Sequence, residues 1–377
     1  MKKDFKWLIY GQLGTFMWHK KADPNRVADP KGHYIADKTV IYADNLLRRL
    51  AKARECGADT VLFDIGEAIQ YPSHPELWID GCLDAQKARA LVGRMKDMGY
   101  EVIPSLNFST DHHHWLCQYS RMISTPDYYR VCEDVIRDTW EICGHPAVFH
   151  LGYDEEDANC TFSHAKDYPN LVYVRQGALY WHDLAWFCDV CRKLGSRPSF
   201  WLDKQRRPGY SHETFVKNVG KDVLLTPWDY TSVYEGNTLP KVTKTLDGMV
   251  RLADAGYDMI PVGSNWILPA QRTPERQTTR DNIPNLFAWS KKHLNPDHFA
   301  GFGVAPWAGV SEVGNPAWFE AAELLRDVKV GDALVNWTRD SQSYVLRTPD
   351  MGERRGELPA RSWTWIAGDR SLEKSEF

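Results

Sequence analysis

The chain has 377 residues, which is enough for two average domains or for one large α/β barrel. Its 46 Lys and Arg residues against 50 Asp and Glu residues give a formal charge of -4, so nucleic acid is not an expected partner. No stretch approaches 18 uncharged apolar residues, which excludes a membrane-spanning helix. Aromatic residues make up 12% of the chain, and such flat amphipathic side chains suit both cores and sugar-binding clefts.

The amino end does not have the pattern of a signal peptide. Charged residues continue up to Lys6, and the apolar run that follows, Trp7–Tyr10, is too short for a signal core. A signal cleaved upstream would leave the same sequence. The protein is therefore expected to be periplasmic or extracellular if such a signal was removed, and cytoplasmic otherwise. The sequence leaves the oligomeric state open.

Apolar runs that predict β-strands alternate with amphipathic runs that predict helices. The predicted strands are Trp7–Leu13, Thr60–Ile65, Glu101–Leu106, Ala147–Leu151, Pro198–Leu202, Val223–Thr226, Met259–Val262 and Phe299–Val304. Such alternation favours an α/β fold in which eight parallel strands close into a single (β/α)8 TIM barrel. Residues 1–335 are predicted to form this barrel as a catalytic domain, and residues 336–377 a C-terminal tail or hairpin packed on it.

The clearest helical pattern runs from Asp84 to Met98, where apolar residues recur at spacings of three and four. Gly99 is predicted to end this helix as a left-handed cap. A second pattern of this kind covers Tyr129–Cys143. The chain contains neither a GxGxxG nor a GxxxxGK[ST] motif, so a nucleotide-binding open sheet is not expected.

Four successive carboxylates follow the fourth predicted strand, in the sequence His150-Leu-Gly-Tyr-Asp154-Glu155-Glu156-Asp157. Neighbouring like charges repel and raise one another's pKa. On a regular strand Asp154 and Glu155 would point to opposite faces, so both can turn inward only where the strand has ended. Because barrels carry their active sites at the carboxyl ends of the strands, this run can supply a general acid. A solvated acidic loop is the alternative.

The segment His150-x-Gly152-x-Asp154-Glu155 resembles the H-x-G-G-D-E signature of the glycoside hydrolase family 20 β-N-acetylhexosaminidases, with Tyr153 in place of the second glycine. The resemblance extends over roughly residues 60–310. Segments similar to the third, fifth and eighth strands of that family are Met98–Pro104 with Asn107 and His112–His114, Arg197–Asp203, and Ala305–Trp307.

This resemblance implies that Glu155 is the general acid that protonates the glycosidic oxygen, and that Asp154 orients and stabilises a 2-acetamido group. In such substrate-assisted hydrolysis the sugar's own carbonyl attacks the anomeric carbon, so no protein nucleophile is needed. The implied substrate is a carbohydrate, a terminal 2-acetamido β-hexoside cleaved with retention. His150 is expected to pack beneath the two carboxylates at the substrate site, or to be a core histidine without substrate contact.

Four tryptophans fall at or just past the ends of the fifth to eighth predicted strands: Trp201, Trp228, Trp266 and Trp307. Four indoles around one mouth would form a wall against which a pyranose ring can pack its C–H face. The resemblance places Trp307 at the floor of the sugar pocket. Asn107, Asp203 and Asp229 are short polar side chains at strand ends that can bind sugar hydroxyls, although either aspartate, and Asp229 above all, also suits a helix cap.

Three features depart from the family pattern. The third strand has Ser105 and Asn107 where the family has carboxylates. The seventh ends in Gly263-Ser-Asn-Trp266 in place of the family's Tyr-x-Asp, which serves the acetamide and the outer hydroxyls. The chain also begins almost at the first strand, without the α/β domain that usually precedes the family's barrel.

Two other functions fit the same sequence. A metal-dependent enzyme could take ligands from Asp111–His114, with Asp64, Glu67 and His74, but consecutive histidines cannot all face one metal and no HxH or HExxH spacing is present. A barrel that binds a glycan without turnover would fit the altered third and seventh strands. The leading prediction requires no metal and no cofactor.

Overall fold

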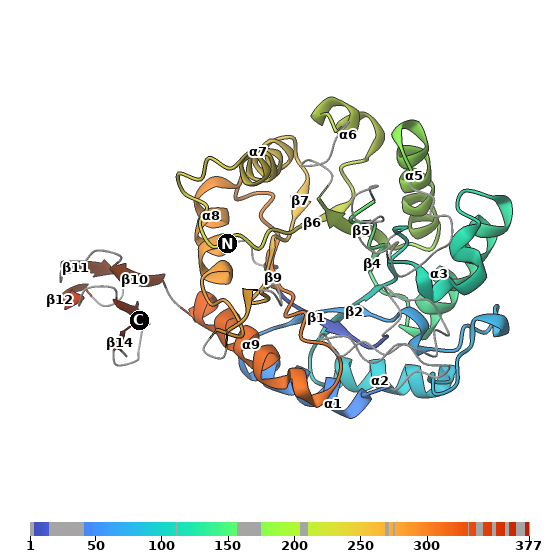
Figure 1. Cartoon of the computed structure of the whole chain (residues 1–377), viewed down its shortest axis with the longest axis horizontal. Helices are drawn as coiled ribbons and strands as arrows, with labels where there is room; N and C mark the ends of the chain where they lie inside the picture. Colours follow the sequence, from blue (N-terminus) through green and yellow to red (C-terminus); the bar gives the residue numbers. More distant parts are fainter. Residues whose placement is uncertain are drawn as a thin grey trace.

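The structure of the chain is a computed structural model (Figure 1). It describes residues 4–14, 41–110, 112–156, 175–203, 210–267, 271–273 and 276–330, together with five short strands beyond them. None of the described helices is long and apolar enough to cross a membrane.

Parallel strands occupy the centre of the molecule (Figure 1). They are β1 (Lys6–Gln12), β2 (Thr60–Asp64), β3 (Glu101–Ser105), β4 (Val148–His150), β5 (Arg197–Leu202), β6 (Leu224–Pro227), β7 (Asp258–Met259), β8 (Val262–Gly263) and β9 (Gly301–Val304). Their hydrogen-bonded order is β7-β6-β5-β4-β3-β2-β1-β9-β8. Strand β9, the last of these in the sequence, therefore lies beside β1, the first.

The strands β7 and β8 are two halves of one strand, broken at Pro261. Proline has no N–H to donate, which interrupts a strand ladder. The first half pairs with β6 and the second with β9, and bridges from Trp228 to Val262 and from Met259 to Phe299 link each half to its other neighbour. The ring therefore closes as eight strands, which confirms the predicted (β/α)8 barrel.

Helices surround the ring, each following one of the eight strands (Figure 1). They are α1 (Ala43–Glu55), α2 (Ala85–Asp97), α3 (Pro126–Ile142), α5 (Gly177–Lys193), α6 (His212–Asn218), α7 (Pro240–Asp254), α8 (Asn282–His293) and α9 (Asn315–Val330). Helix α2 begins after Asp84, whose side chain accepts a hydrogen bond from the Lys87 N–H. Helix α3 begins three residues before its predicted start because Thr125 caps it and Pro126 suits the first position.

Short 3-10 helices complete the barrel: η1 (Gly66–Ala68), η2 (Pro75–Leu77), η3 (His114–Arg121) and η6 (Glu312–Gly314).

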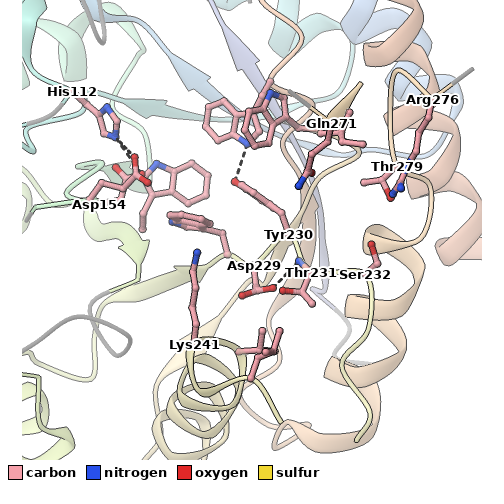
Figure 2. A pocket seen from close by; sticks show the side chains of 18 of the residues that line it. His112, Asp154, Asp229, Tyr230, Thr231, Ser232, Lys241, Gln271, Arg276 and Thr279 are labelled. Carbon is pink, nitrogen blue, oxygen red and sulfur yellow. Dashed lines mark hydrogen bonds and ion pairs between the residues drawn. The ribbon is translucent and has the colours of Figure 1, made fainter. Parts of the chain in front are cut away.

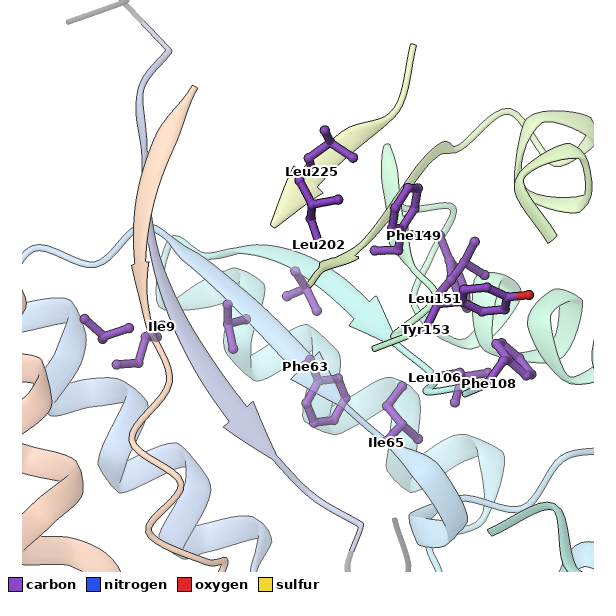
Figure 3. Close-up of a cluster of buried hydrophobic side chains, with 14 of the residues drawn as sticks. Ile9, Phe63, Ile65, Leu106, Phe108, Phe149, Leu151, Tyr153, Leu202 and Leu225 are labelled. Atoms are coloured by element: carbon purple, nitrogen blue, oxygen red, sulfur yellow. The ribbon is translucent and has the colours of Figure 1, made fainter. Parts of the chain in front are cut away.

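The barrel has two apolar layers because successive strand residues point to opposite faces. Leu8 and Tyr10 of β1 belong to the inner cluster, together with Trp201. Ile9 points the other way, into the larger layer between strands and helices (Figure 3). That outer layer holds the strands and helices in fixed positions, so the carboxyl ends of the strands form a rigid frame for a site.

Five short strands follow α9: β10 (Asp332–Asn336), β11 (Gln342–Thr348), β12 (Gly352–Leu358), β13 (Ser362–Ile366) and β14 (Lys374–Glu376). Residues 336–377 were predicted to form a tail or hairpin, and their two apolar segments, Tyr344–Arg347 and Ser362–Ile366, lie in β11 and β13, which do not pair with each other. Strand β11 pairs with the charged segment β12, and β13 pairs with β10 and β14, all antiparallel. The domain boundary at residue 335 stays a prediction.

Candidate active site

A cavity of about 560 Å³ opens at the carboxyl ends of the barrel strands (Figure 2). Eight of the ten residues named for catalysis and substrate binding line it: Asn107, Asp154, Glu155, Trp201, Trp228, Asp229, Trp266 and Trp307. These residues come from six different strand ends, those of β3, β4, β5, β6, β8 and β9. The structure therefore brings together side chains as far apart in the sequence as Asn107 and Trp307.

The segment after β4 makes a tight turn that directs two carboxylates to the cavity. Gly152, Tyr153 and Glu155 all have left-handed backbone angles, with φ of +67°, +70° and +55°. Gly152 is required here, because a Cβ atom at this position would lie 2.2 Å from Cγ of Asn107. The turn lets the consecutive Asp154 and Glu155 line the same cavity, as a continued strand could not.

Asp154 is buried and held by Asn107. The Asn107 Nδ2 group donates a hydrogen bond of 2.8 Å to Oδ1 of Asp154, while Asn107 Oδ1 accepts from the backbone N–H groups of Tyr153 and Ser109. Burial raises the pKa of Asp154 to about 6; His112 opposes this shift, and the charge of Glu155 adds to it. Asp154 is therefore a positioned carboxylate that is ionised at neutral pH and gains a proton in mildly acidic solution.

Glu155 is more open to the cavity than Asp154, with 28% of its side chain exposed. Its Oε2 atom lies 3.1 Å from Nε2 of the buried His112, which is also 3.7 Å from Oδ2 of Asp154. The Glu155 N–H donates to Oδ2 of Asp203 over 3.2 Å. One buried carboxylate, one open carboxyl group and a shared imidazole can perform acid and base chemistry on a bound molecule.

The four predicted tryptophans and Tyr230 form an aromatic wall of the cavity, and the buried Tyr10 packs behind Trp307; sequence reasoning missed both tyrosines. Trp307 donates from Nε1 to the Tyr230 hydroxyl over 2.8 Å, and its ring lies 4.6 Å from that of Tyr10. Tyr230 in turn stacks on Trp228 with 5.0 Å between ring centroids. The only sequence signals were an aromatic residue in the first strand and another two positions after Trp228. This wall offers flat apolar surface with polar edges.

His150 lies outside the cavity lining, which corrects its prediction as a substrate-binding residue. Its Nε2 and Nδ1 atoms lie 3.0 Å from the hydroxyls of Thr226 and Ser105, and Nδ1 also accepts from the Gly152 N–H. Burial lowers the pKa of His150 to about 3, so it is neutral. The inner position of residue 150 on β4 places the ring in the barrel interior, where it supports the turn from below.

Asp203 also lies outside the cavity lining. It is buried at the end of β5, where its carboxylate accepts the hydrogen bond from the Glu155 backbone. Its position therefore fixes Glu155 in place, and this differs from the predicted contact with a sugar hydroxyl. Asp229 does line the cavity, but its carboxylate accepts hydrogen bonds from the Thr231 N–H and the Tyr234 hydroxyl.

The histidines named for a metal site diverge in the structure. His112 turns to the cavity, His113 lies 3.2 Å from the Tyr128 hydroxyl in the core, and His74 contacts Glu76 and Asp134. Burial raises the pKa of Asp64 to about 8, with a further contribution from the neighbouring Glu67. The predicted ligand set therefore does not converge among the described residues, and Asp111 lies outside them.

Another set of three could hold a cation. One ligand atom each of His112, Asp154 and Glu155 lies within 4.8 Å of the others. An imidazole and two carboxylates suit a divalent ion such as Zn²⁺ or Mn²⁺. Direct contacts between His112 and the two carboxylates also explain this arrangement without a cation.

The third carboxylate of the acidic run turns into the core. Glu156 accepts hydrogen bonds from the backbone N–H groups of Thr110 and Arg175. The buried Arg175 guanidinium lies 3.3 Å from Glu156, 2.6 Å from Asp183 and 2.8 Å from the Tyr128 hydroxyl. A buried cation thus compensates the acid next to Glu155, which explains how successive carboxylates are held together. Asp157 lies outside the described residues.

Comparison by sequence gives no relatives: no family model and no curated protein matches the chain. Comparison of structures finds several solved barrels. A β-N-acetylhexosaminidase from Bacteroides fragilis is 14% identical with a TM-score of 0.54, over 85% of this chain and 66% of that one. An exo-β-N-acetylglucosaminidase of glycoside hydrolase family 20 from Vibrio harveyi, in complex with N-acetylglucosamine, is 11% identical with a TM-score of 0.54, over 85% and 54%.

A chitobiase from Flavobacterium johnsoniae is 13% identical with a TM-score of 0.55, over 85% of this chain and 48% of that one. The chain thus spans between 48% and 66% of the length of these three proteins. It has the barrel fold of the glycoside hydrolase family 20 enzymes, as the resemblance of its sequence implied.

Proposed function

We propose that this chain is a glycoside hydrolase that removes terminal 2-acetamido β-hexosides. One observation carries the proposal: Asp154 and Glu155, which follow each other in the chain, both open on a single cavity walled by four tryptophans. The chain shares its fold with solved enzymes that are named as a β-N-acetylhexosaminidase, an exo-β-N-acetylglucosaminidase and a chitobiase, and this likeness supports the same class of activity. Because the chain spans only part of those proteins, the activity is proposed for this barrel alone.

In the proposed reaction Glu155 is the proton donor. The carbonyl oxygen of the substrate's 2-acetamido group forms a bond to the anomeric carbon while the bond from that carbon to the leaving oxygen breaks. The leaving oxygen takes the proton from the Glu155 carboxyl group. Glu155 then removes a proton from water as the water opens the cyclic intermediate, which restores the carboxyl group. His112, 3.1 Å from Glu155, orients this carboxyl in both steps.

Asp154 is proposed to stabilise the positive charge that develops on the cyclising acetamide. Its hydrogen bond from Asn107 fixes the direction of the carboxylate before the substrate binds, which suits preorganised electrostatic stabilisation. Trp201, Trp228 and Trp307 would pack against the apolar face of the sugar ring. His150 and Asp203 act only through the residues that they position.

Replacement of Glu155 by Gln tests the proton donor. Gln keeps the shape and a hydrogen-bonding group but has no transferable proton, so kcat should fall by at least about 10²-fold on glycosides with poor leaving groups. Hydrolysis of dinitrophenyl glycosides, whose leaving group needs no proton, should fall much less. The two substrates measured on one variant control for misfolding. Equal losses on both, or none on either, would remove Glu155 from this role.

A metal-dependent hydrolase is the second candidate, because the ligand atoms of His112, Asp154 and Glu155 are close enough to share a cation. In the leading proposal the cation is unnecessary, since the acetamide supplies the nucleophile. Dialysis against a chelator should therefore leave activity unchanged. Loss on dialysis with recovery on addition of Zn²⁺ or Mn²⁺ would favour the second candidate.

A further inference from the structure

A second cavity, of about 450 Å³, lies beside the cavity that Asp154 and Glu155 line, which we call the first cavity. Trp266 and Trp307 line both, so the two cavities share an aromatic boundary. The other residues of the second cavity come from the segment between β8 and α8, from the segment between β9 and α9, and from the first turns of α9. The proposed reaction gives these residues no role.

The segment between β8 and α8 supplies polar side chains to both cavities. Gln271, Arg276 and Thr279 line the first cavity, whereas Arg272, Gln277 and Thr278 line the second. Figure 2 shows Arg276 and Thr279 on the side of the first cavity that is far from Asp154. A substrate that extends away from Asp154 along the first cavity would therefore approach the boundary with the second.

The second cavity combines apolar surface with a few polar groups. Besides the two indoles, its apolar lining consists of Pro306, Ala308, Val313, Pro316 and Ala317. Indoles and small apolar side chains can pack against the C–H face of a sugar ring. A largely apolar cavity with a small number of placed polar groups is the usual form of a site for a small molecule.

Glu320 provides an acceptor in the second cavity. Its Oε2 atom accepts hydrogen bonds from the Asn265 amide and the Thr278 hydroxyl, which hold the carboxylate in place. Its Oε1 atom lies 3.8 Å from Nε of Arg280, beyond hydrogen-bonding distance, and makes no hydrogen bond with a described residue. Since 24% of the side chain is exposed, Oε1 can accept a hydrogen bond from a hydroxyl of a bound molecule.

Arg272 provides donors in the same cavity. Its Nε atom donates to the Ile267 carbonyl over 3.2 Å, which fixes the base of the guanidinium. Its two terminal nitrogens have no hydrogen-bond or ion-pair partner in the part of the chain that the structure describes. A guanidinium donor and a carboxylate acceptor in one cavity are complementary to a neutral molecule that both accepts and donates hydrogen bonds, as sugar hydroxyls do.

We propose that the second cavity binds a further sugar ring of the substrate, so that the natural substrate is an oligosaccharide. This inference rests on the proposed function and names the class of leaving group, because the sugars that follow the terminal one leave together as a chain. The further ring would pack against the apolar lining and exchange hydrogen bonds with Arg272 and Glu320. One chain can occupy both cavities because they share Trp266 and Trp307.

Substrates of increasing length test the proposal. The one-sugar reference is the methyl 2-acetamido β-hexoside, compared by initial rates with β-linked oligosaccharides of two, three and four 2-acetamido sugars. For the wild-type protein, kcat/KM should increase by about tenfold at the length that reaches the second cavity, the factor expected for one charge-assisted hydrogen bond. The same kcat/KM at every length would overturn the proposal.

The variants Arg272→Gln and Glu320→Gln should each remove most of this increase. The increase is a ratio of two substrates on one variant, so partial misfolding affects both values alike. Lys244→Gln and Glu323→Gln are the matched controls, because these residues lie on α7 and α9 but line neither cavity. Both controls should keep the wild-type increase. An increase that survives in Arg272→Gln and Glu320→Gln, or an equal loss in the controls, would contradict the proposal.

A binding measurement separates failure of this inference from failure of the proposed function. If none of the glycosides is hydrolysed, calorimetry with the same four compounds on the wild type and the four variants still measures the effect of length. An affinity that increases with length, and that loses this increase in the Arg272 and Glu320 variants alone, would support the second cavity as a sugar site without hydrolysis. Equal affinity for all four compounds would count against it.

Discussion

Asp154 shows how the site depends on a residue that is unfavourable for the fold. Its carboxylate is buried among aromatic side chains and other acids, and this environment raises its pKa to about 6. Asn107 and His112 compensate part of that cost by a hydrogen bond and a nearby imidazole. The residual cost is typical of functional residues, whose environments are arranged for the reaction and not for stability.

Two measurements on Asp154 should depend on pH in opposite directions. The proposed stabiliser must be an anion, so kcat/KM should fall as the pH decreases through about 6 and Asp154 gains a proton. In the unfolded chain its pKa is near the ordinary 3.8. The folded protein therefore binds this proton more tightly than the unfolded chain does. As a result, the free energy of unfolding decreases as the pH rises from about 4 to about 6, and the decrease is complete above that range.

Asp154→Asn should therefore raise the melting temperature at pH 7.5 but change it little at pH 4, although the variant loses activity. Thermal unfolding of wild type and variant at both pH values checks this. A variant that is less stable than wild type at pH 7.5, or a flat kcat/KM between pH 7 and 4.5, would show that Asp154 is not the strained anion described above.

At the scale of elements, the site depends on the close approach of the segments that follow β3 and β4. Gly152 lies against Asn107 so closely that no side chain fits between them. This contact places the Asn107 amide where it accepts from the Tyr153 N–H and donates to Asp154. The backbone crossing thus determines the direction of the carboxylate.

Gly152→Ala should destabilise the protein by at least about 1–2 kcal/mol, because an L-residue is strained at this left-handed φ. The added methyl group should also displace Asn107. The hydrogen bond from Asn107 to Asp154 would then be lost, so kcat should fall. Gly93→Ala is the control: this glycine lies within α2 with no neighbouring atom within 4 Å of the added Cβ, and should stabilise by up to about 1 kcal/mol. Urea unfolding and kcat of both variants check the prediction, which a stable and active Gly152 variant would contradict.

Sequence periodicity predicted most of the barrel elements but not their interruptions. The seventh strand was predicted as the continuous run Met259–Val262, and Pro261 divides it into β7 and β8. The charged segment β12 was not predicted as a strand, since its pairing with β11 is not encoded in an apolar alternation. Local patterns specify which residues are apolar, whereas strand breaks and partners depend on contacts distant in the sequence.

At the scale of the whole molecule, closure of the barrel brings the ends of β3, β4, β5, β6, β8 and β9 to one cavity. The two carboxylates and the four tryptophans could be predicted because each lies at or just after the end of a recognisable strand. His112 could be named but not placed, because the directions of consecutive loop residues have no period. Tyr230 and Trp307, which are hydrogen-bonded across 77 positions, meet only when the ring closes.

The most direct test of the account compares 2-acetamido β-hexosides with the corresponding 2-hydroxy β-hexosides that carry the same aryl leaving group. The account predicts hydrolysis of the 2-acetamido compounds only, because the 2-hydroxy compounds lack the internal nucleophile and give Asp154 nothing to stabilise. A thiazoline that mimics the cyclised intermediate should bind more tightly than the free sugar product. Equal or faster hydrolysis of the 2-hydroxy glycosides would contradict the account, and would reassign Asp154 either as a direct nucleophile or as a base that activates water.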